Sequence, residues 1–251
     1  MRYDPAPGNE EPYVDAAQQS AAWARIAATA GQGVPGASLT AAGLACVGDL
    51  DADSLGVVVI TAGRIRTIAL ATDERSARLE DAQLVSGEGP CTEAYLDAAL
   101  IQVPDLHESP GRWPAFAETA GAVGIRSVTA VPLSVGQARV GAIDLYHTVP
   151  TTLDPAALAR LEAYARIVAA LLLDAYPDLV SATATPAAAP PGFPPVVHQA
   201  AGVLSARQQM SVETALARLR AHAYRHEEPL LDVAHRVLDG RLLLERDHDS
   251  P

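Results

Sequence analysis

The side chains best suited to binding chemistry lie near the C-terminus, where arginines and one tyrosine are spaced along a predicted helix. Arg220 and Tyr224 are four residues apart and therefore share one flank of that helix. Arg218 and Arg225 lie on the other flank, and Arg207 ends the preceding predicted helix. A guanidinium forms charge-assisted hydrogen bonds with phosphate oxygens, and a tyrosine ring can stack on an unpaired base. The pattern predicts a phosphate-binding surface; the alternative is a row of solvated surface side chains.

A second group of candidates follows the motif G-E-G-P-C, which ends at Cys91. Glycines let the backbone approach a ligand closely, so the loop that carries Cys91 is a candidate ligand-binding loop, and ordinary loop chemistry is the alternative. A cysteine at a helix N-terminus can have a lowered pKa and serve as a redox thiol; the alternative is a small packed residue. Cys46 is the second cysteine, and without a histidine cluster the spacing predicts no metal site.

The chain of 251 residues is acidic, with a formal net charge of -12, and all 18 of its basic residues are arginines. This charge argues against a general nucleic-acid binder. It is unevenly placed: from Pro194 onward seven arginines face eight acids, which gives -1 and leaves -11 for the rest. Any contact with nucleic acid must therefore be local. Because no apolar run approaches a membrane span and no signal core begins the chain, we expect a cytoplasmic protein.

A proline- and alanine-rich stretch, S-A-T-A-T-P-A-A-A-P-P-G-F-P-P, has no helical or strand period and predicts an extended linker. The expected organisation is a disordered N-terminus (1–12), a sensor domain (13–178), the linker (179–194), a small domain (195–244) and a disordered tail (245–251).

Before the linker, helical patterns mix with two hairpins, one split by A-G and one by G-Q. Hairpins imply an antiparallel sheet with helices packed against it, which is an α+β fold. The segment 155–176 predicts a long helix, with Asp154 as N-cap and Pro155 in its first turn. Leu158, Leu161, Ala165, Val168 and Leu172 form a heptad seam on that helix. The seam could pair two copies of the chain, or simply pack on its own sheet.

The blocks G-E-G-P-C, V-P-D-L, R-W-P-A-F, G-I-R-S-V-T-A-V-P-L and G-A-I-D-L-Y, in that order, resemble a GAF domain of the bacterial regulatory type. The resemblance covers about Val14 to Tyr176. It implies a ligand-sensing module that binds a small molecule between its sheet and the loops covering one face. The ligand itself is not implied.

After the linker, three short helices are predicted, with Ser211 as the N-cap of the second and Gly240 closing the third. Their blocks H-Q-A-A-G-V-L-S-A-R, A-L-A-R-L-R-A-H-A-Y and P-L-L-D-V-A-H-R-V-L-D-G-R-L resemble an ANTAR domain, over Pro194 to Leu244. The resemblance implies a dimeric RNA-binding antiterminator that holds stem-loops of a nascent transcript. Relatives often place a polar residue where this chain has Ala201. Next to it we expect Gly202 to lie where a neighbouring helix approaches closely.

The resulting hypothesis is a non-enzymatic, signal-responsive regulator that binds RNA stem-loops, works as a homodimer, and contacts neither membrane nor DNA. Its RNA-binding candidates are Arg220, Tyr224, Arg207, Arg225 and Arg218, and its ligand-binding candidates are Cys91, Asp105 and Trp113. The sequence contains no G-x-S-x-G, H-E-x-x-H, P-loop or dinucleotide-binding motif. Two alternatives stay open. One is a cysteine-based GAF reductase of oxidised methionine, and the other is a protein-interaction module that has lost RNA binding.

Overall fold

A five-stranded antiparallel sheet forms the centre of the N-terminal domain, in the strand order β2-β1-β5-β4-β3. The computed structural model describes residues 16–31, 38–61, 64–109, 111–136, 138–176, 195–226 and 228–244. The predicted linker and the predicted disordered ends lie outside these residues. The strands are β1 (Ser54–Thr61), β2 (Arg64–Ala71), β3 (Ile101–Val103), β4 (Ser127–Val135) and β5 (Ala138–His147).

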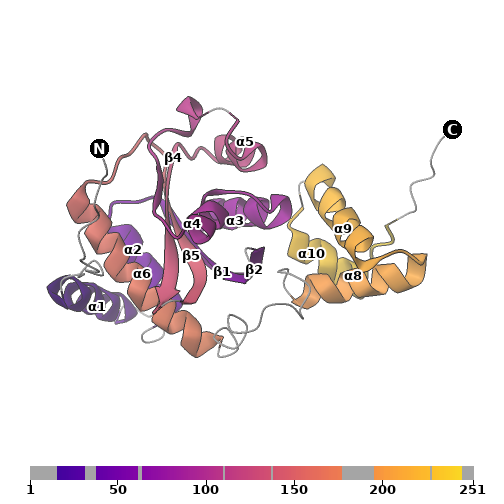
Figure 1. The fold of residues 1–251 in the computed structure, drawn as a ribbon, viewed down its shortest axis with the longest axis horizontal. Coiled ribbons are helices and arrows are strands. Elements are labelled where there is room, and N and C mark those ends of the chain that lie inside the picture. The colour runs from indigo at the N-terminus through magenta and orange to yellow at the C-terminus, as the bar shows by residue number, and fades with distance from the viewer. Residues whose placement is uncertain are drawn as a thin grey trace, which may run out of the picture.

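Helices cover both faces of this sheet (Figure 1), as the alternation of side chains along a strand requires. On β5, Ile143 and Leu145 belong to the core against one face, whereas Ala142, Asp144 and Tyr146 point to the other. The first face carries α1 (Ala16–Ala30), α2 (Leu39–Asp49) and α6 (Pro155–Ala175). The second carries α3 (Glu74–Ser86) and α4 (Pro90–Asp97). The 3-10 turn η1 (Leu106–Glu108) and α5 (Pro114–Ala122) complete the domain, which has the predicted α+β fold.

The long helix α6 begins as its sequence predicts. The Asp154 carboxylate accepts the backbone N–H of Ala157 at 2.7 Å, and Pro155 occupies the first turn. Four of the five seam residues, Leu161, Ala165, Val168 and Leu172, are buried in the protein's own core, with Leu158 packed at its edge. Within one chain the seam therefore packs on the sheet, and pairing of two copies stays a prediction.

Three helices form the C-terminal domain: α8 (Pro195–Gln208), α9 (Val212–His226) and α10 (Leu230–Leu238). Ser211 accepts the N–H of Thr214 at 3.0 Å and caps α9, as predicted. Gly240 follows α10 with a positive φ of 71°, which is typical of the residue that ends a helix. No described helix has the length and apolar character needed to cross a membrane.

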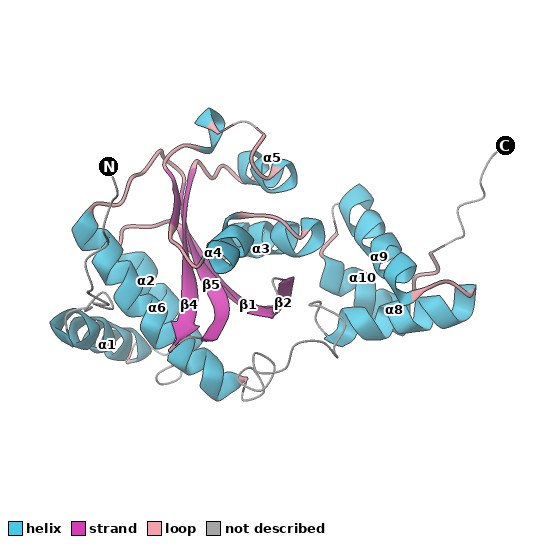
Figure 2. Ribbon diagram, viewed as in Figure 1, coloured by secondary structure: helices cyan, strands magenta, loops and turns pink. Residues whose placement is uncertain are grey.

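The two domains share one hydrophobic cluster. It combines Leu84 and Val85 of α3 with the core residues of α8, α9 and α10, such as Leu219 and Leu230. Figure 2 shows the three C-terminal helices beside the end of α3 rather than on the α1, α2 and α6 side. Helix α3 is thus packed between the sheet and the C-terminal domain.

Candidate RNA interface and sensor site

Arg220, the foremost RNA-binding candidate, is turned toward the sensor domain. Its guanidinium donates to the carbonyl oxygen of Val85, and to that of Ser86 at 2.9 Å. These carbonyls belong to the last turn of α3, where backbone oxygens have no partner within the helix. A cation at this end also suits the helix dipole. The side chain predicted to bind phosphate therefore caps a helix of the other domain.

Tyr224 lies on the same flank of α9, one turn further on. Its hydroxyl donates to Glu118 Oε2 of α5 at 3.3 Å, while 62 % of the residue stays exposed. Both residues of the predicted RNA-binding flank thus face the sensor domain, although only Arg220 is firmly held there.

The remaining candidate arginines do not reach the sensor domain in the described hydrogen bonds. Arg207 and Arg225 are exposed to solvent. Arg218 donates to Gln208 Oε1 of α8 at 2.8 Å, which ties two helices of the C-terminal domain together. Arg236 on α10 pairs with Glu228. The structure therefore separates Arg220 and Tyr224, which bond to the sensor domain, from Arg207 and Arg225, which are exposed to solvent.

A third contact completes the interface. The carboxylate of Asp81 on α3 accepts the backbone N–H of Leu230, the first residue of α10, at 3.0 Å. Burial raises the pKa of Asp81 to about 6, although the hydrogen bond from Leu230 lowers it. Sequence reasoning missed this residue, because its partner lies 149 positions away in the chain.

The expectation about Gly202 in the first ANTAR helix needs correction. A Cβ added at Gly202 would meet no atom of the described residues within 4 Å, so none of the described helices approaches it closely. Ala200 and Ala201 are the fully buried residues of this motif. Ala201 belongs to the cluster shared by the two domains, so it does not occupy an exposed phosphate-contact position here.

Cys91 lies fully buried at the start of α4, within a network of polar side chains. Gln83 of α3 donates through Nε2 to Glu80 Oε2 at 3.0 Å and to Asp144 Oδ2 at 2.6 Å. The hydroxyl of Tyr146 lies 2.7 Å from Glu80 Oε1 and 3.1 Å from Asp144 Oδ2. The Cys91 N–H donates to Gln83 Oε1 at 3.0 Å, which fixes the orientation of the amide.

Two glycines make room for this network. A Cβ at Gly56 of β1 would lie 1.8 Å from the Glu80 carboxylate. A Cβ at Gly89, whose φ is 154°, would lie 2.1 Å from Gln83 Oε1. The second glycine of G-E-G-P-C is therefore needed for close approach, and Pro90 follows as the first residue of α4.

Burial raises the pKa of the Cys91 thiol well above its ordinary value, and the nearby Asp144 and Glu80 add to this. This direction favours the alternative of a small packed residue over a thiol activated by a helix N-terminus, because loss of hydration outweighs the dipole. Burial also raises the pKa of Glu80, helped by Asp144, and that of Asp144 itself. The direction of these shifts shows that burial disfavours the charged forms of the three groups unless a cation neutralises them.

The other two ligand candidates have structural partners elsewhere. Asp105 caps η1 through the His107 N–H and pairs with Arg126, whose Nη2 lies 2.5 Å away. Trp113 is 7 % exposed and donates through Nε1 to Glu93 Oε2 of α4 at 3.1 Å. No described hydrogen bond joins either residue to Cys91. Trp113 is thus hydrogen-bonded to α4, the helix that contains Cys91, whereas Asp105 is paired with Arg126 instead.

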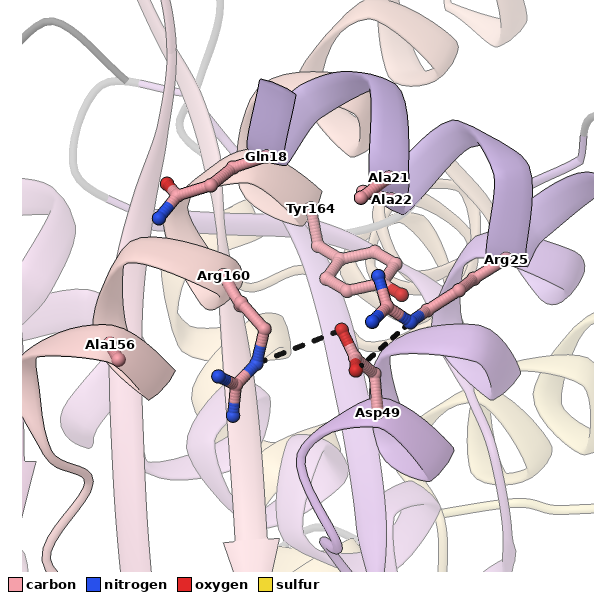
Figure 3. A pocket seen from close by; sticks show the side chains of 8 residues that line it. All are labelled: Gln18, Ala21, Ala22, Arg25, Asp49, Ala156, Arg160 and Tyr164. Atoms are coloured by element: carbon pink, nitrogen blue, oxygen red, sulfur yellow. Dashed lines mark ion pairs between the residues drawn. The ribbon is translucent and has the colours of Figure 1, made fainter. Parts of the chain in front are cut away.

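A hollow of about 200 Å³ lies on the opposite face of the sheet, between α1, α2 and α6. Figure 3 shows Asp49 between Arg25 and Arg160, at N–O separations of 3.0 and 3.8 Å. These pairs join the three helices, so the hollow is a packing feature of the helical layer rather than part of the Cys91 network.

Comparison with known families agrees with this architecture. Residues 36–172, more than half of the chain, match the GAF domain family, and residues 195–238 match the ANTAR domain family. The chain therefore belongs to the GAF-domain proteins and carries a C-terminal ANTAR domain. The pair defines a signal-sensing regulator of the ANTAR class, as its sequence predicts. No curated protein matches the chain.

Solved structures similar to the chain come from proteins of several kinds and organisms. A domain of a two-component sensor histidine kinase protein from Sinorhizobium meliloti is 18 % identical, with a TM-score of 0.45, and the match covers 56 % of this chain and 92 % of that one. The GAF domain of an Acinetobacter phosphoenolpyruvate-protein phosphotransferase is 13 % identical, with a TM-score of 0.47 and coverages of 63 % and 95 %. A type II free methionine-R-sulfoxide reductase from Thermoplasma acidophilum is 16 % identical, with a TM-score of 0.40 and coverages of 62 % and 96 %.

The sequence interpretation missed four side chains around Cys91: Glu80, Gln83, Asp144 and Tyr146. A signal was present in β5, where Asp144 interrupts the otherwise apolar run A-I-D-L-Y. A carboxylate in a strand covered on both faces must have partners, because an isolated buried charge is too costly. The partners on α3 could not be identified from spacing alone.

Proposed function

We propose that this protein is a cytoplasmic, signal-responsive regulator that promotes transcription antitermination by binding stem-loops in nascent leader RNA, as a homodimer. The observation that carries the proposal is the position of Arg220 and Tyr224. The two side chains best suited to RNA on α9 are bonded to the sensor domain. Such a contact suits a regulator, because the sensor domain can then control whether the ANTAR domain is free to bind RNA.

In the arrangement described, RNA cannot use the guanidinium of Arg220 without displacing it from the end of α3. Arg207 and Arg225 remain exposed and can attract phosphate groups. We therefore infer a closed state with weak RNA binding and an open state in which Arg220 and Tyr224 are added to the interface. The proline- and alanine-rich sequence between the domains predicts an extended linker, which would allow this separation without breaking either domain.

Helix α3 is the element through which the sensor would act. Its inward side chains, Glu80 and Gln83, belong to the buried network beside Cys91. Its outward groups, the Asp81 carboxylate and the carbonyl oxygen of Ser86, hold the ANTAR domain. A ligand or redox signal that moves α3 by a fraction of a turn would disturb both outward contacts together.

The test is RNA binding by the full-length chain, measured by gel shift with tandem stem-loops from a leader transcript. Asp81→Ala and Asp81→Asn both remove the carboxylate charge, but only Asn keeps an oxygen that can accept the Leu230 N–H. Asp81→Ala should therefore open the interface more easily and bind RNA up to about fivefold more tightly than Asp81→Asn, since a helix cap contributes about 1 kcal/mol.

Arg220 is then tested in the opened protein. Adding Arg220→Ala to Asp81→Ala should lower RNA affinity and make the dependence of log K on log salt shallower by about one phosphate contact. Arg166→Ala, an exposed arginine on α6, is the matched control and should change neither quantity. Absence of any RNA binding by Asp81→Ala at low salt would reject the proposal and favour the protein-interaction module.

The cysteine-based reductase receives less support. Cys46 is a buried residue of α2 in the core against one face of the sheet, whereas Cys91 lies on the other side of the sheet. Both are fully buried, and burial raises the pKa of both thiols. A reductase needs reactive thiolates that can meet substrate and then each other, which this arrangement does not provide.

A further inference from the structure

Three potential metal ligands converge beneath α3, from three separate elements. Glu80 lies on α3, Cys91 begins α4, and Asp144 lies on β5. One ligand atom from each residue lies within 4.8 Å of the other two, and all three residues are buried. Glu80 and Asp144, which are 64 positions apart in the sequence, thus lie close together on the face of the sensor domain that also contacts the ANTAR domain.

The hydrogen bonds within the network leave one oxygen unsatisfied. Both Nε2 protons of Gln83 are used, one on Glu80 and one on Asp144. Tyr146 has a single hydroxyl proton to share between the same two carboxylates. Asp144 Oδ1 is buried and accepts no hydrogen bond of ordinary geometry among the described residues. The Cys91 thiol interacts with this carboxyl group and lowers its pKa, but a thiol is only a weak donor. An unpartnered buried polar atom costs about 1–3 kcal/mol, so the site is one contact short.

The charge of these buried acidic groups also indicates that the site lacks a partner. None of the described ion pairs includes Glu80 or Asp144, although two carboxyl groups and a thiol are enclosed together. The chain has no lysine that could reach them. Burying such a group of acids without a cation is unfavourable unless they hold protons.

We propose that Glu80, Cys91 and Asp144 bind a divalent transition-metal cation of the Zn²⁺ type. One thiolate with two carboxylates suits a borderline-soft ion, whereas Mg²⁺ and Ca²⁺ take oxygen ligands alone. Zn²⁺ bonds of about 2.0–2.3 Å place tetrahedral ligand atoms roughly 3.5 Å apart, which small side-chain rotations reach from the present separations. Binding releases the protons of the thiol and the carboxyl groups to solvent.

The ligand of the sensor domain would then be a divalent transition-metal cation. Its regulatory consequence rests on the proposed function, but the binding itself does not. Drawing Glu80 toward Cys91 and Asp144 would shift α3, whose Asp81 and Ser86 hold the ANTAR domain. Metal occupancy would then change the exposure of Arg220. Three protein ligands leave a fourth position for water or for a signal molecule.

The experiment uses the full chain, stripped with a chelator and titrated with Co²⁺, then with Zn²⁺ as competitor. Wild type should bind about one equivalent and develop the near-ultraviolet band of a cobalt thiolate. Cys91→Ala should lose that band, and affinity should fall at least about tenfold. Cys46→Ala is the matched control, because it removes the other buried thiol and should leave the band unchanged.

Asp144→Asn keeps the shape of the side chain and removes its charge, so it tests the proposal independently if Cys91→Ala folds poorly. The Co²⁺ affinity of this variant should fall, while its near-ultraviolet circular dichroism without metal should stay that of wild type. Mg²⁺ in excess should not displace Co²⁺. The proposal is overturned if wild type takes up no Co²⁺, if Cys91→Ala keeps the band, or if Asp144→Asn binds as wild type does. Because RNA is absent throughout, failure here is distinct from failure of RNA binding.

Discussion

The Asp81 carboxylate of α3 accepts the backbone N–H of Leu230 at 3.0 Å, so the sensor domain caps the first turn of the last ANTAR helix. Pro229, which precedes α10, provides no side-chain cap of its own. In return, Arg220 caps the last turn of α3. Each domain thus satisfies helix-end groups of the other, and water can replace both caps when the domains separate. The interface is specific and yet reversible.

Hydrogen exchange should report this capping directly. In Asp81→Ala the first turn of α10 loses its acceptor, so amides in 228–238 should exchange up to about fivefold faster than in Asp81→Asn, for a cap of about 1 kcal/mol. Amides of α6, on the far face of the sheet, serve as the internal reference and should be the same in both. Equal exchange of 228–238 in the two variants would show that Asp81 does not hold α10.

Tyr224 allows its hydroxyl and its ring to be tested separately. The hydroxyl bond to Glu118 is long and exposed, so Tyr224→Phe should leave domain docking and RNA affinity near the wild-type values. Tyr224→Ala removes the ring, and a stacked base contributes about 1–3 kcal/mol, so affinity should fall by at least about fivefold. The comparison is made by filter binding in the Asp81→Ala background. If Phe and Ala weaken binding equally, the ring does not stack on a base.

The elements of the fold could largely be predicted because their signals are local. Asp154 and Ser211 cap helices in the structure as their types and positions predict. Both hairpins are found between the predicted strands, and α4 begins only one residue before the expected Cys91. Such features depend on neighbours within a few residues, which a sequence shows directly.

The sites could be predicted only in part, because they depend on contacts between distant segments. Arg220 and Tyr224 were placed correctly on one flank of α9, but helical spacing cannot tell which partner that flank faces. Cys91 was identified through its glycine motif, whereas Glu80 and Asp144 join it only through the packing of α3 on β5. Gly202 was misjudged for the same reason, since helix packing is a long-range property.

Two glycine substitutions should have opposite effects on stability. A methyl group at Gly202 meets open space in α8, so Gly202→Ala should raise the free energy of unfolding by about 1 kcal/mol through helix propensity. The methyl group of Gly56→Ala would clash with the Glu80 carboxylate, so this substitution should lower the free energy of unfolding by about 1–3 kcal/mol. Urea unfolding followed by circular dichroism measures both. A loss of stability in Gly202→Ala would mean that a neighbour does fill that space.

The acid sensitivity of the sensor domain should depend partly on His147, at the end of β5. Burial lowers the pKa of its imidazole, although Asp53 and a hydrogen bond with the backbone of Leu50 act the other way. The unfolded chain therefore binds the proton at higher pH than the folded chain. This residue's contribution to stability is full above the ordinary value of about 6.5 and is lost as pH falls toward the lowered folded pKa.

Urea unfolding between pH 8 and 5 should show that His147→Asn flattens this loss relative to wild type. The exposed His107→Asn is the control and should keep the wild-type slope. The buried carboxyls affect all three proteins alike, so the difference between slopes isolates His147, and parallel slopes for wild type and His147→Asn would refute the assignment.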